Sequence, residues 1–232
     1  MKDSIEISMV NSIASENLKG IAADASEMVI DTLLTDEAIK SIPIFGTLLK
    51  TYNIFGSIKE QLFAQKVLSF LSSISAGSAQ ERDLLISKLT KAKGSTKRLG
   101  ETIILILDRL DDQEKPELIG RLFLACANDE ITVDQLFRYT GFIERLYIGD
   151  IKAFQNLWSK DISKENIEAY QAAGLMITEL VHPNDPPKGH VVNENSIYYG
   201  QKSELRFSLS LHAKDLAFVL YKVKQEITEV WV

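Results

Sequence analysis

The stretch SIPIFGTLLKTYNIFG, from Ser41 to Gly56, shows the helical character of this chain most clearly. Its apolar residues recur every three or four positions, which is the spacing of one face of an α-helix. The predicted face consists of Phe45, Leu48, Leu49, Tyr52 and Phe55, with Lys50 beside it. Gly56 predicts a break, after which an apolar stripe through Ile58, Leu62 and Phe63 predicts a second helix to about residue 75.

Helical patterns extend over most of the first 175 residues. An amphipathic helix is predicted over residues 15–34, and Pro43 prevents it from continuing smoothly into the next one. Further helix starts are predicted where Ser, Thr or Asp precedes Glu or Gln by three positions, because the two residues can satisfy free amide groups reciprocally. These boxes are Ser78 with Glu81, Asp111 with Glu114 and Thr132 with Gln135, and Ser95 and Ser163 are predicted as single caps.

The pattern changes near the C-terminus. Residues 182–190 contain three of the five prolines and predict a loop. ELRFSLSLH, residues 204–212, alternates apolar and polar residues and predicts a half-buried strand. Partner strands are predicted at HVVN, SIYYG and ITEVWV, and a helix over AKDLAFVLYKVKQ. We therefore predict a mainly α protein, with a multi-helix bundle over residues 1–175 and a small α+β appendage, made of short antiparallel strands and a helix, over 176–232.

Composition limits the class of protein. Of the 232 residues, 45% are hydrophobic and 25% charged, as in ordinary globular domains. No apolar run reaches the roughly 20 residues that a spanning helix needs, and no basic start followed by an apolar run predicts a signal peptide. The single cysteine excludes an internal disulfide and fits a reducing cytosol. We expect a cytoplasmic protein, either free or peripherally bound at the inner face of the membrane.

The net charge of −6 is unevenly distributed. Residues 41–100 carry nine basic and three acidic side chains, between the acidic segments 1–40 and 101–150. The three segments can neutralise one another in the fold, or the basic one can face anionic lipid or nucleic acid. Its densest patch consists of Lys88, Lys91, Lys93, Lys97 and Arg98. Because no aromatic residues are interleaved to stack on bases, the patch favours a solvated helix end over a nucleic-acid site.

Few residues suggest catalysis. Cys126 lies on an apolar helical face, far from any histidine in the sequence, and is therefore predicted to be a core residue. The histidines His182, His190 and His212, even with Asp185, match no metal-ligand spacing. Motifs for nucleotides, zinc proteases and hydrolases do not occur. We predict no catalytic residue, no metal and no other cofactor.

One pair keeps an enzymatic alternative open. Arg206 and His212 match the R-x(4–6)-H signature of a family of helical ribonucleases, in which histidine would act as acid or base and arginine would bind phosphate. In that family the pair lies at a helix start. Here the alternation places both residues on one face of a strand.

The helix over residues 42–55 allows three environments. It would be about 21 Å long, shorter than the roughly 30 Å hydrocarbon core, and Lys50 opposes insertion. Its apolar face fits a bundle core, a groove on a partner or a membrane interface. Burial in the core is the default for such a face.

Three segments together suggest a family: IPIFGTLLKTYNIFGSIKEQLFAQKVLSFL, ILDRLDDQEKPELIGRLFLA and ITVDQLFRYTGFIERLYIGDI. Over about residues 40–155 they resemble small helical bacterial proteins and are loosely similar to the all-helical TerB-like domains of tellurite-resistance and phage-defence systems. The likeness lies in the helix pattern, and no acidic metal-binding motif allows a residue role to be carried over. The resemblance implies a cytoplasmic bacterial protein that acts in stress or defence.

The leading hypothesis is a non-enzymatic helical interaction or adaptor protein. Its partner would be another protein or a second copy of the chain, and its partner surface would include residues 41–75. The first alternative is a membrane-acting effector that exposes the 42–55 helix to an anionic membrane surface. The second is a ribonuclease that uses Arg206 and His212.

Overall fold

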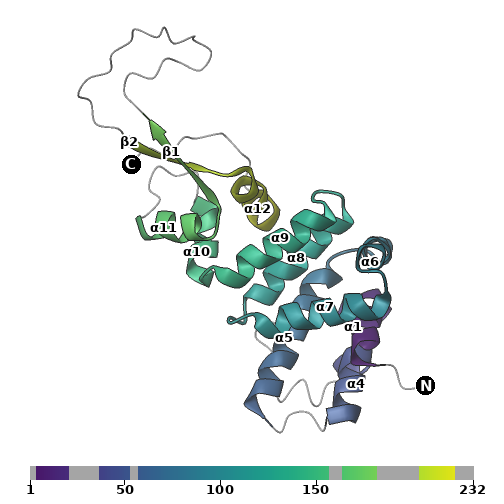
Figure 1. Ribbon diagram of the computed structural model, residues 1–232. Helices are drawn as coiled ribbons and strands as arrows, with labels where there is room; N and C mark the ends of the chain where they lie inside the picture. The colour runs from purple at the N-terminus through teal and green to yellow at the C-terminus, as the bar shows by residue number, and fades with distance from the viewer. Residues whose placement is uncertain (1–3, 21–36, 53–56, 157–163, 182–203, 223–232) are drawn as a thin grey trace, which may run out of the picture. The chain divides into compact units, whose positions relative to one another are not determined.

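The computed structural model describes residues 4–20, 37–52, 57–156, 164–181 and 204–222 (Figure 1). The chain divides into two compact units, Met1–Ile151 and Lys152–Val232. The first unit is helical, and the second contains a small antiparallel sheet together with helices. This confirms the predicted mainly α fold with a small α+β appendage. The sequence analysis placed the boundary after residue 175, whereas the compact units meet after Ile151.

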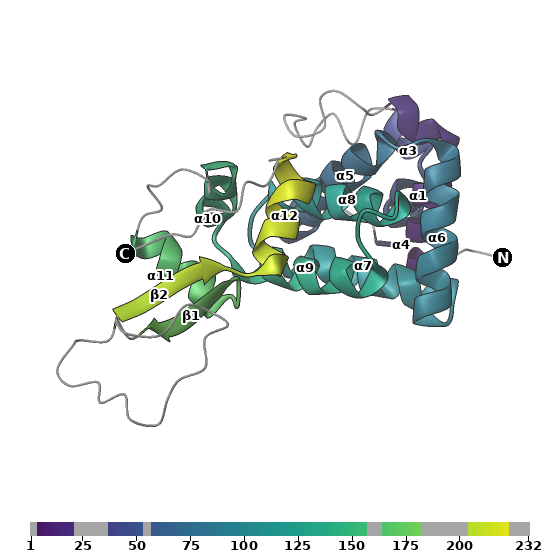
Figure 2. The ribbon, with the colours of Figure 1, turned by 90° about the horizontal axis from the view of Figure 1, so that it is seen from above.

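The first unit is a bundle in which α7 lies above α4 and α5 in Figure 1, and α6 runs beside α1, α7 and α8, as Figure 2 shows from above. Its elements are α1 (Ile5–Ala14), the 3-10 helix η1 (Glu16–Gly20), α3 (Glu37–Lys40), α4 (Pro43–Tyr52), α5 (Ile58–Ser75), α6 (Ala79–Lys93), α7 (Thr96–Arg109), α8 (Lys115–Ala127), α9 (Val133–Arg145) and the start of α10 (Ile148–Ala153).

Two glycines allow the closest helix contacts in this bundle. A Cβ atom on Gly100 of α7 would lie 1.9 Å from the carbonyl oxygen of Glu6, so α1 and α7 pack backbone against backbone. A Cβ atom on Gly120 of α8 would lie 2.5 Å from Cβ of Ser73 on α5. Both positions therefore require a residue without a side chain.

Hydrogen bonds of two buried serines of α1 join it to α4. Ser12 Oγ accepts a 2.8 Å hydrogen bond from the amide of Ile44, one of the first amides of α4, and donates to the carbonyl oxygen of Ser8. The first amides of a helix have no partner within the helix, so Ser12 acts as a cap supplied by a neighbouring helix. Ser8 Oγ and Thr47 Oγ1 share a further 2.7 Å hydrogen bond.

A buried arginine binds the C-terminal end of α1. Arg82 of α6 is fully buried, and its Nε donates a 2.8 Å hydrogen bond to the carbonyl oxygen of Ile13. Its two terminal nitrogens donate to the carbonyl oxygens of Gly77 and Ser15. The last carbonyl groups of a helix are partnerless and carry partial negative charge, so a cation stabilises them.

Most of the predicted caps are confirmed. Ser78 with Glu81 and Thr132 with Gln135 form complete capping boxes, and Ser95 caps α7. The box of Asp111 with Glu114 is wrong, because Glu114 makes no side-chain cap at the start of α8. The Asp111 carboxylate instead forms an ion pair with the ammonium group of Lys115.

The second unit contains η2 (Phe154–Asn156), α11 (Lys164–Ala172), β1 (Met176–Val181), β2 (Glu204–Leu209) and α12 (Leu211–Tyr221). The strands pair antiparallel, with Met176 opposite Leu209 and Val181 opposite Glu204. The strand predicted over residues 204–212 is confirmed as far as Leu209. Its last part is wrong, because the side chain of Ser210 accepts a hydrogen bond from the amide of Ala213 and starts α12.

Sequence analysis did not predict α1, α3 or β1, and among the described residues β1 is the strand that pairs with β2. The helix predicted from residue 15 begins as the 3-10 helix η1. The predicted elements that lie outside the described residues are the rest of the 15–34 helix, Ser163, the 182–190 loop, HVVN, SIYYG and ITEVWV.

Candidate interaction surface

The structure places much of the predicted partner face of the 42–55 helix in the core. Phe45 and Leu48 of α4 are only 2% and 3% exposed, and Leu49 is partly exposed. Lys50 and Tyr52 also belong to α4, but the structure describes only their backbone. Phe55 lies outside the described residues. Of the three environments predicted for this helix, the structure shows burial in the core for Phe45 and Leu48.

A cavity opens beside this part of the core, where α4, α5 and α7 meet. Its volume is about 280 Å³, and its lining residues are Leu48, Lys59, Glu60, Phe63 and Asp108. Leu48 and Phe63 supply apolar surface from α4 and α5. The three charged side chains come from the first turn of α5 and the last turn of α7.

Glu60 has a structural task at this cavity. Ser57 caps α5 by accepting a hydrogen bond from the amide of Glu60, and the Glu60 carboxylate accepts one from the amide of Ser57. This reciprocal box fixes the start of α5. The Glu60 carboxylate is thus engaged in folding.

Lys59 and Asp108 are exposed charges on two different walls of the cavity, α5 and α7. Neither forms an ion pair within 4.0 Å with any residue that the structure describes. The cavity therefore has one positive and two negative groups beside the apolar side chains of Leu48 and Phe63, and the Glu60 carboxylate is engaged in the capping box.

Exposed apolar side chains occur on two of the helices that line the cavity. Ile58 and Leu62 of α5 are 73% and 39% exposed, and each directly precedes a cavity-lining residue in the sequence. Leu105 is 46% exposed and lies one turn before Asp108 on the same side of α7. We call the cavity together with the exposed residues Ile58, Leu62 and Leu105 the α5–α7 surface.

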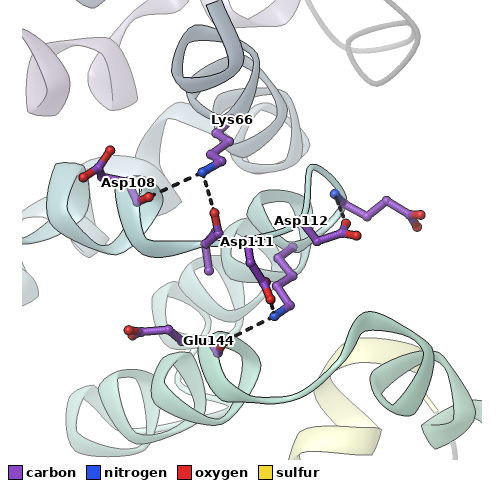
Figure 3. A network of polar contacts seen from close by, with 8 residues as sticks. Lys66, Asp108, Asp111, Asp112 and Glu144 are labelled. Atoms are coloured by element: carbon purple, nitrogen blue, oxygen red, sulfur yellow. Dashed lines mark hydrogen bonds and ion pairs between the residues drawn. The ribbon is translucent and has the colours of Figure 1, made fainter. Parts of the chain in front are cut away.

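Lys66 fixes the end of α7 at this surface (Figure 3). Its Nζ donates hydrogen bonds to the carbonyl oxygens of Leu110, at 2.5 Å, and Asp108, at 3.4 Å. Burial lowers the pKa of Lys66, and the carboxylates of Asp108 and Asp111 oppose that shift. Lys66 thus holds the backbone that presents the Asp108 side chain.

Lys115 holds the start of α8 in the same network (Figure 3). Its buried Nζ donates hydrogen bonds to Asp111 Oδ1, at 2.5 Å, and to the carbonyl oxygen of Glu144 at the end of α9, at 3.3 Å. The hydrogen bond from Lys115 lowers the pKa of Asp111, since it favours the ionised carboxylate. The connection between α7 and α8 is therefore fastened by a lysine at each end.

The predicted basic patch is partly used for packing. Lys88 donates hydrogen bonds to the carbonyl oxygens of Cys126 and Ala127, the last residues of α8, and forms a 2.7 Å ion pair with Asp129. The ammonium group of Lys93 lies 3.7 Å from the centre of the Phe137 ring. Lys91, Lys97 and Arg98 are exposed. Two of the five cations thus stabilise the fold.

The other chemical candidates do not assemble into a site within the described part of the chain. Cys126 is buried, as predicted, and burial raises the pKa of its thiol. Arg206 lies on β2 and His212 in the first turn of α12, so their predicted position on one strand face is wrong. Among the described residues, no three potential metal ligands cluster and no helix is long and apolar enough to cross a membrane. His182, Asp185 and His190 lie outside the described residues.

The fold defines a mainly helical protein with a small α+β unit, and within the described residues the α5–α7 surface combines a cavity with exposed apolar side chains. No protein-family model, no curated protein and no solved structure matches the chain. The resemblance to TerB-like domains therefore stays a prediction.

Sequence reasoning did not identify the α5–α7 surface. It assigned Ile58, Leu62 and Phe63 to one stripe, but Ile58 and Leu62 are exposed. The local spacing gave no signal for this exposure, because the same apolar stripe occurs on a helix face whether or not a distant element covers it.

Proposed function

We propose that this chain is a non-enzymatic interaction protein that binds another protein through the α5–α7 surface. The observation that carries the proposal is the cavity whose lining includes Leu48 and Phe63, together with exposed Ile58, Leu62 and Leu105 on the same two helices, α5 and α7. Protein interfaces commonly combine a pocket that accepts an anchoring side chain with surrounding contacts that exclude water. Large apolar side chains grouped around such a pocket are typical of a binding surface.

The burial of Phe45 and Leu48 favours this proposal over the membrane-effector alternative. That alternative requires the apolar face of α4 to leave the core, which would cost the free energy of its burial. The resemblance described above suggests bacterial stress or defence as the setting, and we include this setting in the proposal.

Photo-crosslinking in the native host tests the proposed surface. A photoreactive phenylalanine analogue replaces Leu62 in one variant and Leu84, an exposed residue of α6, in a matched control. We expect a discrete protein adduct from position 62, absent from position 84 and lost when Phe63→Asp is added. Thermal melting checks that each variant remains folded.

Three results would contradict the proposal. Equal adducts from both positions, or no protein adduct from position 62, would remove the surface from the function. Adducts with lipid, together with binding to phosphatidylglycerol vesicles, would support the membrane alternative. Cleavage of RNA that is abolished by His212→Ala would support the ribonuclease alternative.

A further inference from the structure

We draw no further inference here: the strongest candidate, the two-stranded sheet of β1 and β2 with the exposed side chains of Ile177 and Leu180 on β1, leaves its outer strand edges unpaired among the described residues, and nothing that the structure describes shows what covers them.

Discussion

Lys66 of α5 donates a 2.5 Å hydrogen bond to the carbonyl oxygen of Leu110, which lies 44 residues later and follows the last residue of α7. The same relation occurs at the ends of three other helices. Arg82 binds the end of α1, Lys88 the end of α8 and Lys115 the end of α9. In each case a cation from a neighbouring helix satisfies carbonyl groups that would otherwise lack a partner.

Gly100→Ala should destabilise the chain. The new methyl group would lie 1.9 Å from the carbonyl oxygen of Glu6, so α1 and α7 would have to separate. We expect a loss of roughly 1–3 kcal/mol or more in the free energy of unfolding, measured by urea denaturation. The control is Gly141→Ala in α9, where the methyl group would meet only Arg145 at 3.5 Å and should stabilise the helix by up to about 1 kcal/mol. Equal effects of the two substitutions would refute the close packing of α1 on α7.

Arg82→Met should also destabilise the chain, because it removes the donor of hydrogen bonds to backbone carbonyl groups. It leaves the buried carbonyl group of Ile13 and the partly buried carbonyl group of Gly77 without their donor. We expect a cost of roughly 1–3 kcal/mol for each carbonyl group that stays unpaired. Lys91→Met, which changes an exposed cation on the same helix, should have little effect. A melting temperature that is unchanged in Arg82→Met would show that α1 does not depend on this guanidinium.

Phe45→Ala and Leu49→Ala separate core from surface on α4. Phe45 is buried, so Phe45→Ala should lower the free energy of unfolding by roughly 3–5 kcal/mol. Leu49 is partly exposed, so Leu49→Ala should lower it clearly less. Chemical denaturation provides both values. If Phe45→Ala unfolds at the same denaturant concentration as the wild type, the apolar face of α4 is not core, and the membrane alternative regains support.

Acid should remove the contribution of Asp111. Lys115 lowers the pKa of Asp111 in the folded chain below its ordinary value of 3.8, so the folded state favours the ionised carboxylate. The contribution to stability is therefore complete above about pH 3.8 and is lost as the pH falls through the lower folded pKa. Asp111→Asn should be less stable than the wild type at pH 7, and the difference should shrink in acid. Asp83→Asn, an exposed control on α6, should follow the wild type across the whole range; a constant gap for Asp111→Asn would contradict the assignment.

The sequence predicted the helices well where local rules apply. Apolar periodicity and the boxes at Ser78 and Thr132 depend on residues a few positions apart, so they can be read without a tertiary structure. The α5–α7 surface could not be predicted in this way. Whether Ile58 is buried depends on which distant element covers the start of α5, and the engagement of Lys66 depends on where α7 ends in space.

Each of these helix ends is bound by a cation from another helix, and this has a consequence for how cooperatively the bundle unfolds. The hydrogen bonds of Arg82, Lys66, Lys88 and Lys115 to these helix ends span between 29 and 69 residues of sequence. A fragment that ends after α5 would contain α1 but lack Arg82, and Lys66 would lack the end of α7. Short helices are marginal in water by themselves. We therefore expect the bundle to unfold in a single all-or-none transition, and its fragments to lose far more helix than their length would suggest.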